Sequence, residues 1–142
     1  VLKAEFDPRP SLDEYFMKIA HVVKTRSTCR KNKVGAVLVR DKRIISTGYN
    51  GAPVGMDHCT ECRRKDSEHG KNYDHCPAVH AEVNAIISAA VHAVSTVGGT
   101  LYCTEKPCLA CAKMILNAKI GRIVFPGGEI DDLGAYIAEK LR

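Results

Sequence analysis

The sequence predicts an α/β fold in which helices cover both faces of a mixed sheet. Three observations support this class: an early helix-period stripe, a β-hairpin after it, and a second half that alternates helices with strands. Strands joined through a helix usually run parallel, and such crossovers place helices on the faces of the sheet. The 142 residues are long enough for one packed core, so we expect residues 1–142 to form a single domain.

The first half of the chain predicts one helix and one hairpin. Ser11 and Glu14 form a capping box at the start of the helix, which we expect to end near Thr25. The hairpin has strands at residues 34–39 and 44–49. Apolar side chains at helical spacing should form the core face of the helix: Tyr15, Phe16, Ile19, Ala20, Val22 and Val23.

The second half predicts three helices and two more strands. We expect the helices at residues 79–93, 108–118 and 133–141, and the strands at residues 100–104 and 122–125. Four apolar residues should face inward from the first of these helices: Val83, Ile86, Ile87 and Ala90. Residues 50–77, before that helix, lack periodicity and carry three cysteines and three histidines. A loop this long in a compact domain is usually functional or is held in place by a bound metal ion.

Composition excludes several classes of protein. No apolar run approaches the length of a membrane span, and residues 1–10 hold four charged side chains, unlike a signal peptide. The net charge of +5 suits an anionic substrate, but it is too dispersed for stable nucleic-acid binding, and we interpret the densest basic runs, 30–33 and 63–65, as solvated surface. Seven cysteines without an export signal favour metal ligation in a reducing, cytoplasmic setting.

One pair of motifs carries chemistry: His80-Ala81-Glu82 and Pro107-Cys108-Leu109-Ala110-Cys111. Cys108 and Cys111 lie about one helical turn apart, so their sulfurs face the same side. With His80 they supply three ligands for Zn²⁺, which leaves its fourth tetrahedral position open to water, as in catalytic sites. Glu82 is placed to carry the proton of that water. Alone, a Cys-x-x-Cys could be a redox pair or half of a zinc finger.

With both motifs, the chain resembles the cytidine/deoxycytidylate deaminase superfamily over nearly all of its length. The same two motifs also occur in deaminases of tRNA adenosine, guanine and riboflavin precursors. The resemblance is strongest to deoxycytidylate (dCMP) deaminases, in residues 26–37, 46–55, 58–59 and 80–86. It implies a three-layer α/β/α sandwich with a mixed five-stranded sheet and helices on both faces.

The resemblance implies zinc-dependent hydrolysis of dCMP to dUMP and ammonia, which would supply dUMP for thymidylate synthesis. Glu82 would move the proton of the attacking water to ring N3 and then to the leaving ammonia. The backbone around Ala81 would bind the base edge, Asn50 the sugar and Arg26 the 5′-phosphate. A turn position before Gly51 explains Asn50 equally well, and a surface cation explains Arg26.

Two other functions stay open. The chain could deaminate another base or nucleoside, such as cytidine, guanine or a tRNA adenosine, and activity with dCMP against cytidine would discriminate. It could instead be a non-catalytic, zinc-stabilised binding module, such as a DNA-uptake accessory protein. Retention of Glu82 argues against that class, because a structural zinc needs no proton carrier.

A second zinc site is also implied, because some dCMP deaminases hold a structural zinc with cysteines that match Cys29 and Cys59. One such relative adds a histidine and an acid just before the catalytic histidine, but the acid's position is Ala78 in this chain. Cys62 and Cys76 complete a set of four instead, with His69 or His75 as alternatives to a cysteine. The alternative is that these four cysteines are unrelated thiols that bind no metal. We expect the fifth remaining cysteine, Cys103, to lie in the core.

The resemblance extends to regulation and assembly. Many family members are hexamers that dCTP with Mg²⁺ activates and dTTP inhibits, which implies a homo-oligomer with nucleotide effectors. Some carry an arginine at the position of Val91, and valine cannot pair with a phosphate. This departure weakens the expectation of allosteric control.

Overall fold

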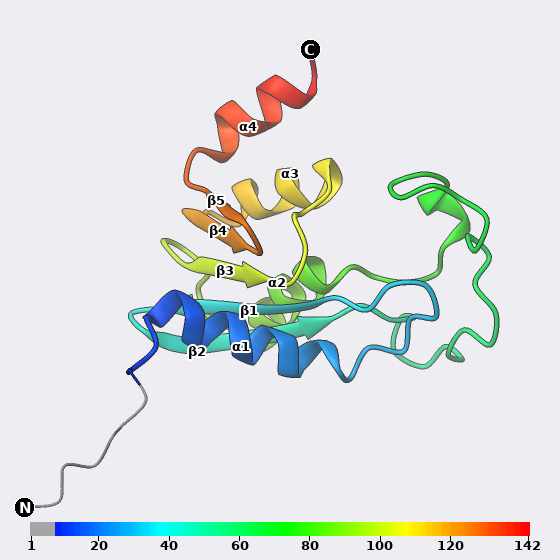
Figure 1. Ribbon diagram of the computed structural model, residues 1–142, viewed down its shortest axis with the longest axis horizontal. Coiled ribbons are helices and arrows are strands. Elements are labelled where there is room, and N and C mark those ends of the chain that lie inside the picture. The colour runs from blue at the N-terminus through cyan, green and yellow to red at the C-terminus, as the bar shows by residue number, and fades with distance from the viewer. Residues whose placement is uncertain (1–7) are drawn as a thin grey trace, which may run out of the picture.

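In the computed structural model, which describes residues 8–142, five strands form one sheet in the order β2-β1-β3-β4-β5 (Figure 1). The strands are β1 (Gly35–Arg40), β2 (Arg43–Tyr49), β3 (Thr100–Cys103), β4 (Arg122–Phe125) and β5 (Gly128–Ile130). Only β3 and β4 pair in parallel, so the sheet is mixed, as predicted. Periodicity missed β5, because a three-residue strand after Gly127 is too short to show alternation.

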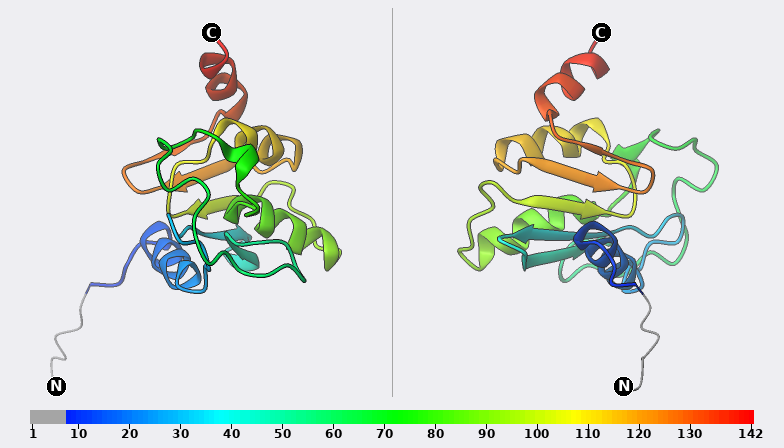
Figure 2. Two further views of the ribbon diagram at one scale, coloured as in Figure 1. Left: turned by 90° about the vertical axis from the view of Figure 1, so that its right-hand side faces the viewer. Right: turned by 60° about the vertical axis from the view of Figure 1, so that its left-hand side comes forward.

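Helices cover both faces of the sheet, which confirms the predicted layers (Figure 2). Helix α1 (Leu12–Lys24) packs on one face, where Phe16 and Ala20 meet Tyr102. Helices α2 (Ala81–Val91) and α3 (Leu109–Asn117) lie on the other face with a larger core. Helix α4 (Leu133–Lys140) packs against α3.

Helix α1 starts as predicted, since the Ser11 hydroxyl accepts a hydrogen bond from the backbone N–H of Glu14. Its core face is narrower than predicted: Tyr15 and Val22 are 47% and 67% exposed. The reason is close packing on β1 at Gly35, where an added Cβ would lie 2.3 Å from the carbonyl oxygen of Ala20. The helix backbone touches the strand directly, so only one row of side chains is covered.

Helix α2 also packs closely, and this overturns part of its predicted inner face. The buried apolar side chains are Ala81, Ala85 and Ala89, whereas Ile87 is 47% exposed and Ala90 is exposed as well. A Cβ at Gly48 of β2 would lie 2.3 Å from the carbonyl oxygen of Ala81. Alanines therefore fill the interface, and the larger apolar side chains lie at its edges or outside it.

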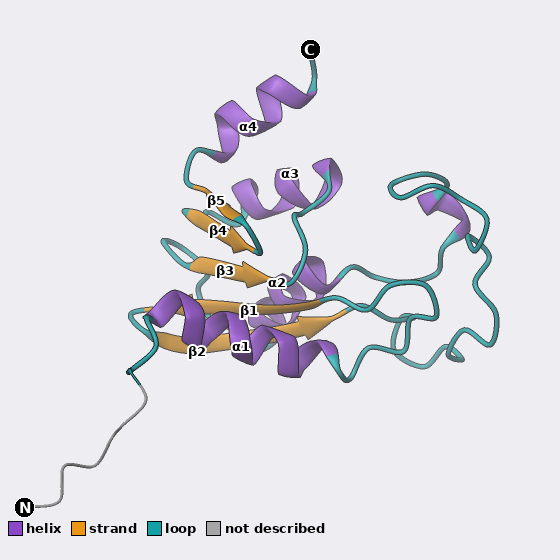
Figure 3. Ribbon diagram, viewed as in Figure 1, coloured by secondary structure: helices purple, strands orange, loops and turns teal. Residues whose placement is uncertain are grey.

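The chain between β2 and α2 contains one helical turn, η1 (Tyr73–His75), and is otherwise irregular (Figure 3). An isolated antiparallel β-bridge between Gly51 and Val79 joins the two ends of this loop. The two ends of this loop are thus fixed next to β2 and α2, although its middle extends away from the sheet. In residues 8–142 no helix combines the length and apolar character that crossing a membrane requires.

Candidate active site

The two helices on the larger core begin at the predicted metal ligands. His80 is the N-cap of α2 and Cys108 is the N-cap of α3, where its sulfur accepts a hydrogen bond from the backbone N–H of Cys111. Both caps have extended backbone angles, so each side chain leaves the start of its helix. Helix starts favour negative charge, which suits thiolate ligands.

The three side chains have the spacing of a tetrahedral metal site. The Nδ1 atom of His80 lies 3.3 Å from the sulfur of Cys111 and 3.6 Å from that of Cys108. Usual Zn–S and Zn–N bond lengths at tetrahedral angles require N···S separations of about 3.5 Å. All three ligand atoms lie within 4.8 Å of one another. The donors that the sequence predicts therefore fit Zn²⁺.

The pKa values of the three clustered ligands are shifted in different directions. The hydrogen bond with Cys111, and then that with His80, lowers the pKa of Cys108 to about 4. The hydrogen bond with Cys108, together with burial, raises the pKa of Cys111. The pKa of His80 is raised, mainly by its hydrogen bond to Cys108. Cys108 is thus ready as a thiolate, and a bound metal ion would displace the second thiol proton.

Glu82 lies two residues into α2 and is 4% exposed. Burial raises the pKa of its carboxyl group, and hydrogen bonds from its own backbone N–H and from Cys111 only oppose that shift. A carboxyl group that gains and loses a proton closer to neutral pH is suited to proton transfer. It is not among the three clustered ligands, as predicted from its spacing to His80.

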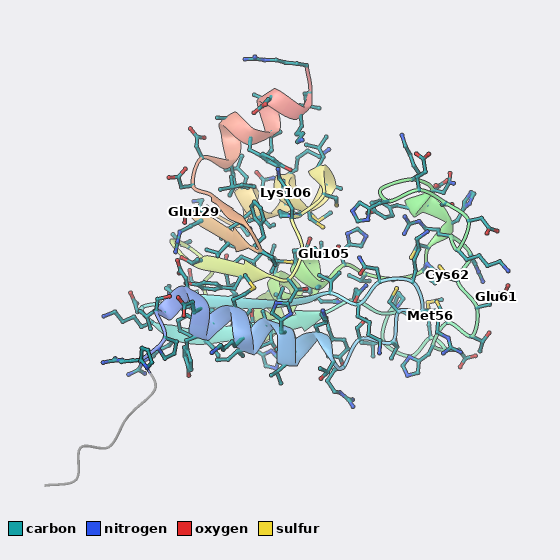
Figure 4. The ribbon with its side chains drawn as sticks, viewed as in Figure 1. Met56, Glu61, Cys62, Glu105, Lys106 and Glu129 are labelled. Atoms are coloured by element: carbon teal, nitrogen blue, oxygen red, sulfur yellow. The ribbon has the colours of Figure 1, made fainter. Side chains whose placement is uncertain are left out.

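A cavity opens beside these residues, with about 670 Å³ of empty space when its mouth is included. The residues on its wall that we predicted for catalysis, the catalytic zinc and substrate binding are His80, Ala81, Glu82, Cys108 and Asn50. Two cysteines predicted for the second zinc, Cys29 and Cys76, border it as well. Glu105 and Lys106, from the segment between β3 and α3, also line it (Figure 4).

Asn50 is 8% exposed, and its side chain joins three segments. Its oxygen accepts hydrogen bonds from the Ser27 hydroxyl at 2.5 Å and the Val34 backbone N–H at 2.9 Å. Its nitrogen donates to the carbonyl oxygen of Asn32 at 2.7 Å. The amide is therefore structural, yet it borders the cavity and has a second N–H available.

Arg26 is exposed after the end of α1 and is not among the residues that line the cavity, so a phosphate contact from Arg26 stays a prediction. The basic residues on the wall are Lys31, Arg64 and Lys106. Lys31 and Arg64 belong to the two basic runs that we interpreted as solvated surface, and that interpretation is wrong for Arg64, which is 8% exposed. Their local charge density was the one signal that could have identified them.

The cysteines predicted for a second zinc line one small cavity next to the active site: Cys29, Cys59, Cys62 and Cys76. Within residues 8–142, no three of their sulfurs come within 4.8 Å of one another. His69 lines the catalytic cavity, as do Cys29 and Cys76, but not the four-cysteine cavity. The Nε2 atom of His75 lies 3.8 Å from a carboxylate oxygen of Asp74. Cys103 is fully buried in the core, as predicted, and burial raises its pKa.

Comparisons with known proteins agree with this geometry. The family described as "Cytidine and deoxycytidylate deaminase zinc-binding region" matches residues 10–126. The deoxycytidylate deaminase of Mycobacterium phage D29 is 42% identical over 125 residues, which cover 83% of this chain and 96% of the phage protein. ComE operon protein 2 of Bacillus subtilis (strain 168) is 41% identical over 120 residues, which cover 82% of this chain and 60% of that protein.

A solved structure extends the agreement to three dimensions. The dCMP deaminase from the cyanophage S-TIM5, in complex with dCMP and dUMP, matches with a TM-score of 0.71 and 32% identity. The match covers 84% of this chain and 83% of that one. The family match includes all three clustered ligands and the buried glutamate beside them. This chain belongs to the cytidine and deoxycytidylate deaminase family.

Proposed function

We propose that this protein is a zinc-dependent enzyme that hydrolyses dCMP to dUMP and ammonia, supplying dUMP for thymidylate synthesis. The observation that carries the proposal is the buried carboxyl group of Glu82 on the wall of a cavity that also holds His80 and Cys108. A proton carrier beside a three-ligand site suits hydrolysis, whereas a binding module needs only the ligands. The relatives named as dCMP deaminases support the substrate.

In this proposal the protein binds the cytosine ring with its C4 atom near His80 and the ring N3 near Glu82. Zinc, which His80, Cys108 and Cys111 would hold, would supply Lewis-acid activation of water near neutral pH. Glu82 takes a proton from the attacking water and delivers it to N3. The water oxygen bonds to C4, and Glu82 then takes the remaining proton of that C4 hydroxyl and transfers it to the amino group. The C4 carbonyl forms as the C4–N bond breaks, and ammonia leaves.

Two further groups would position the nucleotide. The first N–H groups of a helix have no partner within the helix, so the backbone at Ala81 can donate to the base edge. The free N–H of Asn50 can donate to a hydroxyl of the sugar. Because the other polar contacts of Asn50 fix its orientation, this donor would be held in place before substrate arrives.

We also propose a second, structural zinc on Cys29, Cys59, Cys62 and Cys76. The support is that all four residues border one cavity, which neither His69 nor His75 lines. Four thiolates match the closed tetrahedral coordination of structural zinc. Their side chains need to turn toward a common centre, since the sulfurs are not gathered.

Finally, we propose a cytoplasmic homo-oligomer, with a hexamer as the favoured form. Support comes from exposed apolar side chains on β2, α2 and the adjoining loop: Tyr49, Val54, Met56, Ile87 and Val91. Activation by dCTP with Mg²⁺ and inhibition by dTTP belong to the same proposal, but the 73% exposed Val91 offers no cation to a phosphate. Light scattering with and without these nucleotides measures both assembly and its response.

Substrate profiling tests the main proposal. The loss of ultraviolet absorbance on deamination would be followed with dCMP, deoxycytidine, cytidine, guanine and a tRNA carrying the target adenosine. We expect dCMP to give the highest kcat/KM. The Glu82→Gln variant, prepared in parallel, controls for contaminating deaminases. Absence of activity on every substrate, at full zinc content, would refute an enzymatic function.

A further inference from the structure

The irregular loop places a buried cation on the wall of the catalytic cavity without an anion to neutralise it. Arg64 is 8% exposed and lines the cavity together with Glu82. Its Nε donates to the carbonyl oxygen of Lys71 at 2.7 Å. Within residues 8–142, no carboxylate oxygen lies within 4.0 Å of its guanidinium group. Burying an unpaired charge is costly, so an anionic ligand in the cavity would stabilise Arg64.

The guanidinium group keeps its outer edge free. Neither Nη nitrogen of Arg64 donates a hydrogen bond to any residue in the described range 8–142. Every fully buried side-chain nitrogen or oxygen of those residues has a partner, so the two Nη atoms are open to a cavity surface. Arg64 borders both the catalytic cavity and the smaller four-cysteine cavity, and Glu82 lies on the wall of the former only.

The position of Arg64 relative to the metal ligands fits the far end of a nucleotide. Its guanidinium carbon lies 4.2 Å above the ring of Tyr73, and that ring meets His80 edge-on with centroids 4.9 Å apart. One aromatic ring therefore separates Arg64 from the reacting end of the cavity. In the proposed mode of binding, a nucleotide whose base lies at Glu82 extends its sugar and phosphate toward this wall.

The other charged groups on the wall are already engaged. The Nζ atom of Lys31 donates to the carbonyl oxygens of Arg64 and Ser67, which holds the loop in place. Lys106 lies over the rings of Phe125 and Tyr136, at 5.6 Å and 5.1 Å from their centroids. Of the carboxylates, Glu105 accepts a hydrogen bond from Asn32 at 2.6 Å, and Glu82 is needed for catalysis.

We propose that Arg64 binds the 5′-phosphate of the substrate and makes the enzyme prefer nucleotides to nucleosides. This inference rests on the proposed deaminase function and replaces the role predicted for Arg26. The planar fork of an arginine matches two phosphate oxygens, which a lysine does not. Tyr73 supports the guanidinium from one face and Lys71 holds its inner edge, so the free edge points in a fixed direction.

The test compares kcat/KM for dCMP and deoxycytidine in matched variants. Hydrogen bonds to a charged group contribute about 1.5–3 kcal/mol, equivalent to roughly 10–150-fold. We expect Arg64→Met to lower kcat/KM for dCMP by that factor and to change the value for deoxycytidine by less than about threefold. Arg63→Met, which removes the exposed neighbouring arginine, and Arg26→Met should leave the ratio unchanged.

Two further measurements keep the outcome decisive. Arg64→Lys keeps the charge without the fork, so we expect it to fall between wild type and Arg64→Met; it also serves if the methionine variant does not fold. Competitive inhibition by dUMP, relative to deoxyuridine, should weaken in parallel. An equal loss on both substrates, or an unchanged ratio in both Arg64 variants, would overturn the inference. Failure of the wild type on all substrates would instead refute the proposed function.

Discussion

The contact between Gly48 and α2 predicts that adding a single methyl group in the sheet will disturb catalysis. In Gly48→Ala the new Cβ would lie 2.3 Å from the carbonyl oxygen of Ala81 and 2.5 Å from the backbone nitrogen of Ala85. Ordinary van der Waals contact begins at 3.4 Å, so the helix has to retreat by about 1 Å. Backbone atoms cannot rotate away as a flexible side chain can, so the whole start of α2 moves.

That displacement has two measurable effects. Overpacking of this kind usually costs about 1–3 kcal/mol of unfolding free energy. Because Glu82 and His80 are at the start of α2, the same movement misplaces the proton carrier and one metal ligand. A misplacement of about 1 Å can lower the rate roughly 100-fold. We therefore expect Gly48→Ala to lose stability and also activity per folded molecule.

Gly35→Ala is the matched control. Its Cβ would meet the carbonyl oxygen of Ala20 at 2.3 Å and the backbone nitrogen of Lys24 at 2.5 Å, an equal overlap against α1. Helix α1 carries none of the catalytic groups. Urea unfolding should show similar losses in both variants, while kcat, corrected for folded fraction, should fall about 100-fold only in Gly48→Ala. Equal kcat values in two equally destabilised variants would refute the reasoning.

Three further predictions concern the site and its frame. Glu82→Gln should lower kcat by about 10²–10⁴-fold while zinc content and melting temperature stay unchanged; more than a few per cent residual activity contradicts a proton-transfer role. Elemental analysis should find two zinc ions per chain, and a single zinc in metal-replete protein excludes the second site. Cys59→Ser should remove one of the two ions, and it should impair stability, measured by the melting temperature, more than it impairs the chemical step, measured by kcat. Hydrogen bonds from Arg122, and to a lesser extent from Tyr102, lower the pKa of Asp13 in the folded protein. The Asp13 carboxylate therefore stabilises the fold fully above its unfolded pKa of about 4, and this stabilisation is lost as the pH falls through the lower pKa of the folded state. Asp13→Asn should therefore cost up to about 1 kcal/mol of unfolding free energy at pH 7, and the gap between variant and wild type should close in acid; a gap independent of pH contradicts this.

What the sequence predicted correctly was encoded locally. Ser11, the hairpin strands and the three metal ligands are recognised from neighbours within a few residues, because caps, alternation and helical spacing are short-range properties. The inner face of α2 was partly wrong because it depends on Gly48, more than thirty residues earlier in the chain. Periodicity alone cannot show that a distant glycine draws a helix so close that only alanines fit.

The wall of the cavity was harder to predict for the same reason. Arg64 and Tyr73 belong to a loop without periodicity, where no pattern tells which side chains turn inward. Their placement depends on contacts between segments, such as the donation from Lys31 to the carbonyl oxygen of Arg64. Arg26 followed from family resemblance alone, and the structure places it outside the cavity.

The way the irregular loop is attached has a consequence for how such an enzyme can diverge. Residues 63–75 lie between Cys62 and Cys76, which border one cavity, and no strand of the sheet belongs to this stretch. Insertions or replacements here can change which groups face the substrate without moving His80 or Glu82, which are fixed at the start of α2. The proposed phosphate contact of Arg64 is thus encoded in a different stretch of the chain from the catalytic groups at the start of α2, and mutation can alter the first while the second is retained.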